Sequence, residues 1–409
     1  MAFLRSADRA TPALSLITAL VALGALSTSL YTPSLPAIGA DFGASSAAVQ
    51  RTLTSFLVGF AGAQLVIGPL SDAFGRRPVL LVGLAAYVGA GIFCALATTV
   101  EQLTLGRFFQ GFAACAGPVV GRAIVRDLFE GAAAARAFSA VGTALAVVPA
   151  LAPILGGAIQ AQLGWEAAFL ALAAIGLALL GLSSLKLHET IAERRPDALN
   201  PARLVRIYAD LLRNRVYMGH ALAGGLVFGG FFGYFADAPF LFIGELGIAP
   251  DVFGLLMVFT VGGYAGGSYL SGRLAGRWPR RRVILTGTGI SVLGALLLIG
   301  FSGDLTVARV IGPMCVYTLG FGLTLPASFA GALAPFPRVA GSASAMLGFV
   351  QMAGAGAASV AVQPLYDGGA LTLGYVVLAM SAAAFLAHAV LARGDENPAK
   401  TAPKPGGER

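Results

Sequence analysis

The chain is short of charged residues and cysteine. Only 11% of its 409 residues are Asp, Glu, Lys or Arg, against roughly 25% in soluble domains, and 57% are hydrophobic. So little polar surface excludes a soluble protein of this length. The three cysteines all lie inside apolar runs without metal-ligand spacing. They exclude a disulfide scaffold, and we expect inert buried thiols.

Enzyme and nucleotide-binding motifs are also missing. The sequence has no H-E-x-x-H, no nucleophile motif, no P-loop and no paired carboxylates inside apolar runs. We therefore expect no enzyme activity, no bound metal and no cofactor. The net charge of +8 is typical of nucleic-acid binding or of a membrane protein with basic cytoplasmic loops. The low total charge favours the membrane protein, and no nucleic-acid partner is expected.

What the sequence does contain is twelve apolar runs, each near the length of about 20 residues that a bilayer-crossing helix needs. The runs are 12–35, 49–70, 79–98, 102–124, 136–161, 165–186, 215–243, 252–273, 283–302, 306–333, 340–364 and 371–393. They predict an all-α integral membrane fold with twelve transmembrane helices. The first run is expected to span the membrane, because it is too long for a cleaved signal peptide and lacks a small-residue cleavage site.

Lysine and arginine are placed asymmetrically along these runs. With a cytoplasmic N-terminus, 24 of the 27 basic residues fall in cytoplasmic segments, and Arg51, Arg107 and Arg309 are the exceptions. Basic residues accumulate on the cytoplasmic side of membrane proteins. The pattern predicts that both termini are cytoplasmic.

The charged loop 187–214 divides the spans into two groups of six. The stretch YTPSLPAIG resembles ADAPFLFIG, which aligns Pro33 with Pro239, although shared composition is an alternative explanation. Two six-helix halves are typical of transporters whose substrate site lies between the halves. The expected domains are a six-helix bundle 1–190, a cytoplasmic loop 191–214, and a six-helix bundle with a short tail 215–409.

The most specific motif follows the second run and contains Gly68, Asp72, Gly75, Arg76 and Arg77. A carboxylate at a span end reaches an arginine or a helix N-terminus, and a glycine permits a tight or left-handed turn. The stretch matches the G-x-x-x-D-x-x-G-R-R signature of the major facilitator superfamily. The resemblance implies the fold of that family, in two pseudo-symmetric bundles, and a gating role for this motif.

The fourth run resembles a second motif of that family, L-x-x-x-R-x-x-Q-G, with Arg107 and Gln110. An arginine within a span costs about 2.5–3.5 kcal/mol on insertion scales, so a polar interior is expected around it. The resemblance implies a role for Arg107 in proton coupling. The alternative is that Arg107 extends its charge to the nearby outer surface.

The fifth run carries Pro149, Pro153, Gly156 and Gly157, which bend a helix and allow close helix approach. It resembles the antiporter motif of drug/proton exchangers, which ends G-P-x-x-G-G. Ala152 stands where that motif has glycine, and ordinary helix packing is the alternative interpretation.

Further stretches resemble the Bcr/CflA drug-resistance subfamily, which includes bicyclomycin and phenicol exporters. They include YTPSLPAI, GRAIVRDLFEG and APFPRVAGSASAMLGFVQ. Members of that subfamily commonly carry an acid where this chain has Ser29. The one carboxylate clearly inside a run is Asp237, and desolvation disfavours the charged form of such a group. We expect Asp237 to serve in proton coupling; a wet position near the outer mouth is the alternative.

The resemblance places the first and seventh spans in a central cavity, for which the expected substrate-contacting residues are Ser29, Tyr31, Gln110, Phe232, Tyr234 and Phe235. Aromatic faces suit an amphipathic organic ligand, and Asp237 would favour cationic or neutral compounds. The expected function is proton-coupled efflux of hydrophobic or amphipathic drugs by a monomer in the lipid bilayer. The resemblance also implies a bacterial inner (cytoplasmic) membrane location. The alternative function is a facilitator that imports or exports a small metabolite, with or without proton coupling.

Overall fold

A computed structural model describes residues 2–191, 193–194, 196–303, 305–336, 339–362 and 370–393. Within these residues, twelve helical segments are long and apolar enough to cross a membrane, and each coincides with one predicted run. The all-helical membrane fold is thereby confirmed. The spans are Leu14–Phe42, Ser46–Phe74, Arg76–Ala95, Val100–Leu128, Arg136–Leu163, Trp165–Lys186, Arg215–Glu245, Pro250–Leu274, Arg280–Gly300, Val307–Leu333, Ala340–Ala361 and Ala370–Leu391.

The first six spans are built from eight α-helices. They are α1 (Ala2–Ser29), α2 (Leu35–Phe42), α3 (Ser46–Phe74), α4 (Arg76–Ala95), α5 (Val100–Ala114), α6 (Ala116–Leu128), α7 (Gly131–Leu163) and α8 (Trp165–Lys186). The last six spans follow a short surface helix, α9 (Pro201–Arg213). They are α10 (Arg215–Pro239) with the π-helical turn η3 (Phe240–Glu245), α11 (Pro250–Leu274), α12 (Arg280–Gly300), α13 (Val307–Leu333), α14 (Ala340–Val362) and α15 (Ala370–Leu391).

Two spans are interrupted near proline. The fourth span breaks at Cys115, between α5 and α6, three residues before Pro118. The first span breaks after Ser29, and the short 3-10 helix η1 (Thr32–Ser34) carries it over Pro33 into α2. Proline cannot donate a backbone hydrogen bond and clashes with the preceding turn, which accounts for both interruptions.

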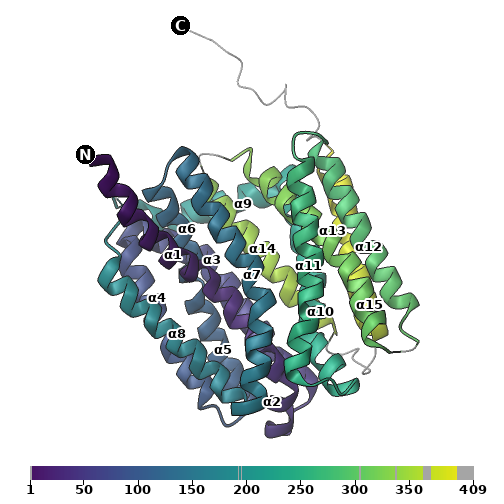
Figure 1. The fold of residues 1–409 in the computed structure, drawn as a ribbon. Coiled ribbons are helices and arrows are strands. Elements are labelled where there is room, and N and C mark those ends of the chain that lie inside the picture. Colours follow the sequence, from purple (N-terminus) through teal and green to yellow (C-terminus); the bar gives the residue numbers. More distant parts are fainter. Residues whose placement is uncertain are drawn as a thin grey trace.

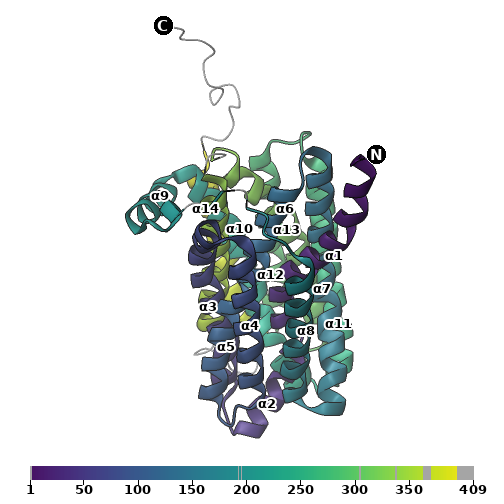
Figure 2. The same ribbon diagram turned by 90° about the vertical axis from the view of Figure 1, so that its left-hand side faces the viewer.

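Each span crosses the bundle in the direction opposite to the span before it, so the loops gather at two ends. Figures 1 and 2 place the N-terminus and α9 at one end and α2 at the other. We call these the basic end and the α2 end, because the α3–α4 turn, α9 and the α11–α12 turn bring many arginines to the first. α9 projects sideways from the bundle at the basic end (Figure 2).

The two groups of six spans share a packed interface. One buried apolar cluster runs through α1 to α8 and includes Phe232, Phe235 and Phe240 of the second group. A second cluster lies within α10 to α15 and contains Tyr234, Phe253 and Tyr317. α7 packs against α11, and α3 packs against α14, across the interface. These two helix pairs therefore join the two groups.

Candidate functional site

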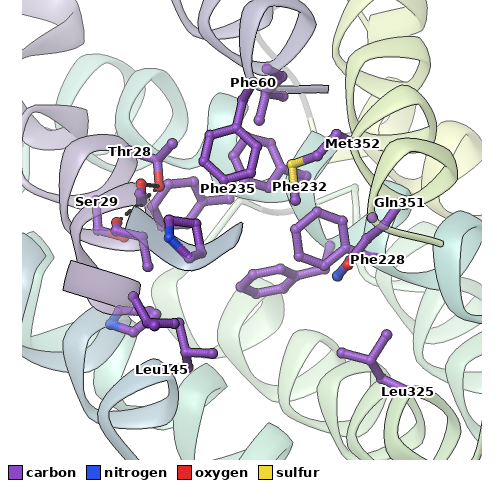
Figure 3. Close-up of a pocket in the computed structure, with 18 of the residues that line it drawn as sticks. Thr28, Ser29, Phe60, Leu145, Phe228, Phe232, Phe235, Leu325, Gln351 and Met352 are labelled. Carbon is purple, nitrogen blue, oxygen red and sulfur yellow. Dashed lines mark hydrogen bonds between the residues drawn. The ribbon is translucent and has the colours of Figure 1, made fainter. Parts of the chain in front are cut away.

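A cavity of about 280 Å³ lies between the two groups of spans (Figure 3). Its wall takes residues from α1, α3, α6 and α7 of the first group and from α10, α11, α13 and α14 of the second. Both groups therefore contact anything bound there. A movement of one group against the other would open or close the same cavity.

The α10 side of the cavity is aromatic. Phe228, Phe231, Phe232 and Phe235 all line it, at the i, i+3, i+4 and i+7 positions that share one face of a helix. The Phe231 ring stacks on Phe321 of α13, with centroids 5.4 Å apart and planes at 21°. These rings form a broad apolar surface suited to a flat organic ligand.

The α1 side of the cavity carries small polar groups. Thr28 and Ser29 lie on one side of it, and Phe228 and Gln351 lie across from them (Figure 3). The Thr28 hydroxyl donates to the Ala25 carbonyl at 2.9 Å, which satisfies its proton within its own helix. Ser29 is buried and adds a hydroxyl to the same wall.

The structure divides the six residues expected to contact substrate. Ser29, Phe232 and Phe235 line the cavity, whereas Tyr31, Gln110 and Tyr234 do not. Tyr234 is turned toward α11, where its hydroxyl points to the Met257 sulfur at 3.8 Å. The span assignment was correct, but helical phase decides which side chains face the ligand.

Tyr31 and Gln110 instead surround Arg107, which is fully buried among α1, α3, α5 and α8. The Arg107 guanidinium lies 4.2 Å from the Tyr31 ring centroid and 4.3 Å from that of Phe56. It donates to the Gln110 side-chain oxygen at 2.6 Å and to the Ser27 carbonyl at 3.2 Å. Arg107 therefore does not extend to the outer surface. Cation–π contacts and these two hydrogen bonds stabilise its charge inside the first group of spans.

Asp237 is also buried, with 1% of its surface exposed, but it lies outside the cavity wall. The side-chain amide of Gln50 on α3 donates to Asp237 Oδ1 at 3.2 Å. This hydrogen bond joins the two groups of spans near the α2 end. Asp237 is thus neither wet in this structure nor a direct determinant of cavity charge.

The gating motif forms a compact ionic cluster at the basic end. The Arg76 side chain pairs with Asp72 and donates from Nε to Asp127 at 3.1 Å and from Nη1 to the Ser71 hydroxyl at 2.7 Å. Gly75 makes the turn with φ of 107°, a conformation that favours glycine. Gly68 precedes this turn in the last part of α3 and approaches α6.

Glu189, which the sequence analysis did not select, completes this cluster. Its carboxylate accepts from the backbone N–H of Arg76 at 3.0 Å and of Arg77 at 3.3 Å, at the N-terminus of α4. Partial burial raises the pKa of Glu189, but backbone N–H donors outweigh it and hold that pKa below its ordinary value. The Arg77 side chain donates to the Leu187 carbonyl at 2.8 Å. No local signal links residues so far apart in sequence.

The helix-bend motif lies where α7 meets α11 near the α2 end. Pro149 lines the cavity, and Pro153 packs against α11 beside Gly254. A Cβ built on Gly157 would lie 2.7 Å from the Pro250 carbonyl carbon, and one built on Gly156 would lie 2.8 Å from the carbonyl carbon of Leu30, just after α1. These glycines permit backbone contact across the interface.

A hydrogen bond between α3 and α14 also crosses the interface in this region. The hydroxyls of Thr54 and Ser359 lie 2.8 Å apart, and both side chains are buried. With the Gln50–Asp237 bond and the α7–α11 contact, it closes the space between the cavity and the α2 end.

The chain resembles known transporters along most of its length. It is 36% identical over 338 residues to the uncharacterized MFS-type transporter YdgK of Bacillus subtilis, covering 80% of this chain and 82% of that one. It is 32% identical over 341 residues to a chloramphenicol resistance protein of Pseudomonas aeruginosa, covering 79% and 76%. The crystal structure of a D-xylose–proton symporter superposes with a TM-score of 0.74 at 16% identity, covering 94% and 97%.

The family model of the Major Facilitator Superfamily matches residues 17–359, from the first span into the eleventh. The resemblance drawn from the motifs is therefore confirmed over most of the chain. It identifies a multi-pass membrane transporter of small molecules and not an enzyme. The chain belongs to the major facilitator superfamily.

Proposed function

We propose that this protein exports hydrophobic or amphipathic organic compounds by alternating access, driven by protons. The observation that carries the proposal is the cavity with its face of four phenylalanines, lying between the two groups of spans. Apolar cavities with few fixed polar groups bind flat organic molecules through burial and ring stacking. The resemblance to a chloramphenicol resistance protein supports export.

The proposed cycle moves the halves 1–190 and 215–409 against each other about this cavity, and the loop 191–214 connects them. The α7–α11 contact, with Pro153 and Gly157, closes the α2 end. The Arg76 cluster stabilises the α3–α4 turn at the other end. Both regions must rearrange when the cavity changes from opening at one end to opening at the other. We therefore assign a gating role to each region.

Asp237 is the proposed proton-coupling residue. Its carboxylate is buried and accepts a hydrogen bond from Gln50 across the interface near the α2 end. Protonation neutralises the carboxylate and changes the strength of that bond, because hydrogen bonds to ionised groups are the stronger ones. A proton entering from the α2 end would thereby favour separation of the halves there. Arg107, enclosed by rings within the first half, is assigned an indirect role, through the position of α1.

The charge pattern supports the proposed membrane orientation. The basic end carries α9 and the α11–α12 turn, with exposed arginines that include Arg203, Arg213 and Arg282. By the positive-inside rule this end faces the cytoplasm and the α2 end faces outward. In a bacterial inner membrane, the protein works as a monomer, because the cavity and both gating regions lie within one chain.

The test is expression in an efflux-deficient bacterial host exposed to a panel of amphipathic antibiotics and dyes. The wild type should raise resistance to at least one compound and lower its accumulation. Asp237→Asn should abolish both effects, while Asp210→Asn, on exposed α9, should preserve them. If the wild type changes neither resistance nor accumulation of any compound, drug export is refuted.

Proteoliposome flux separates the proposed exporter from a facilitator that works without protons. Flux of a compound from the panel should increase when the proton concentration is raised on the α2 side. If flux is the same with and without the gradient, and Asp237→Asn matches the wild type, proton coupling is refuted and facilitated diffusion remains.

A further inference from the structure

Arg122 on α6 lines the cavity, and it is the one charged residue among the described lining residues. Its guanidinium has no carboxylate within salt-bridge distance and no hydrogen bond within the part of the chain that the structure describes. Asp237, the buried acid of the second group, is not among the lining residues. The cavity therefore presents an unneutralised positive charge to its contents.

The residues around Arg122 determine which ligands its charge can bind. Seven of the nine aromatic rings among the lining residues belong to the second group of spans, whereas Arg122, Thr28 and Ser29 belong to the first. Most of the ring faces thus come from the second group, and the one cation comes from the first. Arg122 is partly buried. A cation withdrawn from water is costly unless an anion pairs with it, and arginine pairs best with planar oxyanions.

We propose that the cavity selects aromatic anions, of which an aryl carboxylate is the type, with the carboxylate paired to Arg122. The aryl group then lies against the phenylalanine face of α10 while the acid group lies on the α6 side. This inference rests on the proposed export function and names its substrate class. The sequence predicted a preference for cationic or neutral compounds, because it placed the Asp237 carboxylate at the cavity. A cavity lined by Arg122 and not by Asp237 has the opposite preference.

Ser29 offers a second way to test the sign of the cavity charge. It is buried and lines the same wall of the cavity as Thr28. A carboxylate introduced there would add a negative charge to the cavity wall and oppose the positive charge of Arg122. The Ser29→Asp variant should therefore bind an aryl carboxylate more weakly and an aryl ammonium more tightly than the wild type.

The experiment uses three probes with one ring system: 2-naphthoate, 2-naphthamide and 2-naphthylmethylammonium. Binding to the purified full chain is measured by isothermal titration calorimetry at pH 7. A charge-assisted hydrogen bond predicts at least about tenfold tighter binding of 2-naphthoate than of the amide. Arg122→Gln should reduce 2-naphthoate affinity to that of the amide, and Arg122→Lys should retain part of the preference.

Arg126→Gln is the matched control, since Arg126 lies one turn further along α6, exposed and outside the cavity wall. It should leave all three affinities unchanged. The order of the three probes on the wild type is itself decisive, so the test stands even where a variant fails to fold. If the amide or the ammonium binds the wild type as tightly as 2-naphthoate, or if none of the probes binds, the anion assignment is wrong.

Different results would overturn anion selectivity and drug export. Export of only neutral or cationic compounds by the wild type would overturn the anion selectivity and leave drug export standing. Absence of export for every compound in the cell panel would overturn the proposed function, whatever the probes show in solution. A 2-naphthoate preference that survives Arg122→Gln would assign anion binding to another residue and refute the proposal.

Discussion

Replacing Gly254 with valine should hold the α2 end open. A Cβ on Gly254 would lie 2.6 Å from the Ile154 nitrogen and from the Pro153 carbonyl oxygen, both of them backbone atoms. Favourable carbon contacts are about 3.5–4.0 Å, so α11 must retreat by roughly 1 Å from α7. Such overpacking costs about 1–3 kcal/mol, and it applies only while the α7–α11 contact is closed.

That cost sets the size of the expected shift. A free energy of about 1–3 kcal/mol changes the ratio of the two access states by about 5- to 150-fold. Gly262→Val is the matched control, because Gly262 lies on the same helix with open space around its Cβ position. Both variants exchange glycine for valine in α11, so helix propensity affects them equally.

The shift is measured by labelling a cysteine at Ser359, which is 1% exposed and faces Thr54 in the closed arrangement. The native cysteines are first replaced by alanine, and a membrane-impermeant maleimide is added from the α2 side. Labelling should be at least about fivefold faster in Gly254→Val, by the lower limit of that coupling range, and unchanged in Gly262→Val. Equal rates in both variants, with normal folding, would refute the role of this contact as the closed gate.

Three further substitutions test the other parts of the account. Arg76→Gln should lower the unfolding temperature, because it breaks ion pairs that contribute about 1–2 kcal/mol to stability. This contribution is smaller than that of a fully buried ion pair, because Asp72 and Asp127 are partly exposed. Arg126→Gln, at an exposed position, should leave the unfolding temperature unchanged. The pKa of Glu189 is depressed, so its carboxylate stabilises the fold fully at neutral pH and loses this effect as the pH falls through its pKa. The difference in unfolding temperature between the wild type and Glu189→Gln should therefore become smaller in acid. Arg107→Lys should lower the unfolding temperature through weaker ring contacts; altered proton-driven flux without a change in melting would contradict that structural role.

The sequence predicted the spans well because their signal is local. Twenty apolar residues in a row are sufficient to identify a membrane helix, and all twelve runs coincide with helical spans. The turn at Gly75 could also be predicted from the sequence, because glycine is the residue type that most readily adopts the positive φ found there. The ends were less certain: the first span runs on to Phe42 because η1 and α2 continue it past Pro33.

The side chains within the cavity were harder to predict because they depend on helical phase and tertiary contacts. Phe232 faces the cavity, whereas Tyr234, two residues on, is turned toward Met257 of α11. The partnership of Gln50 with Asp237 joins residues 187 positions apart, which no single-sequence pattern reveals. Arg122 lies in the stretch GRAIVRDLFEG, whose sequence shows only a subfamily resemblance, and its place in the cavity follows from how α6 packs.

The most direct test of the central claim is proton-driven flux through Asp237. Proteoliposomes containing the wild type, Asp237→Asn or Asp210→Asn receive the compound that the cell panel shows to be exported best. Flux is then followed with and without an imposed pH gradient at zero membrane potential. The account predicts that the gradient accelerates flux in the wild type and in Asp210→Asn but not in Asp237→Asn. Acceleration of equal size in Asp237→Asn would contradict it.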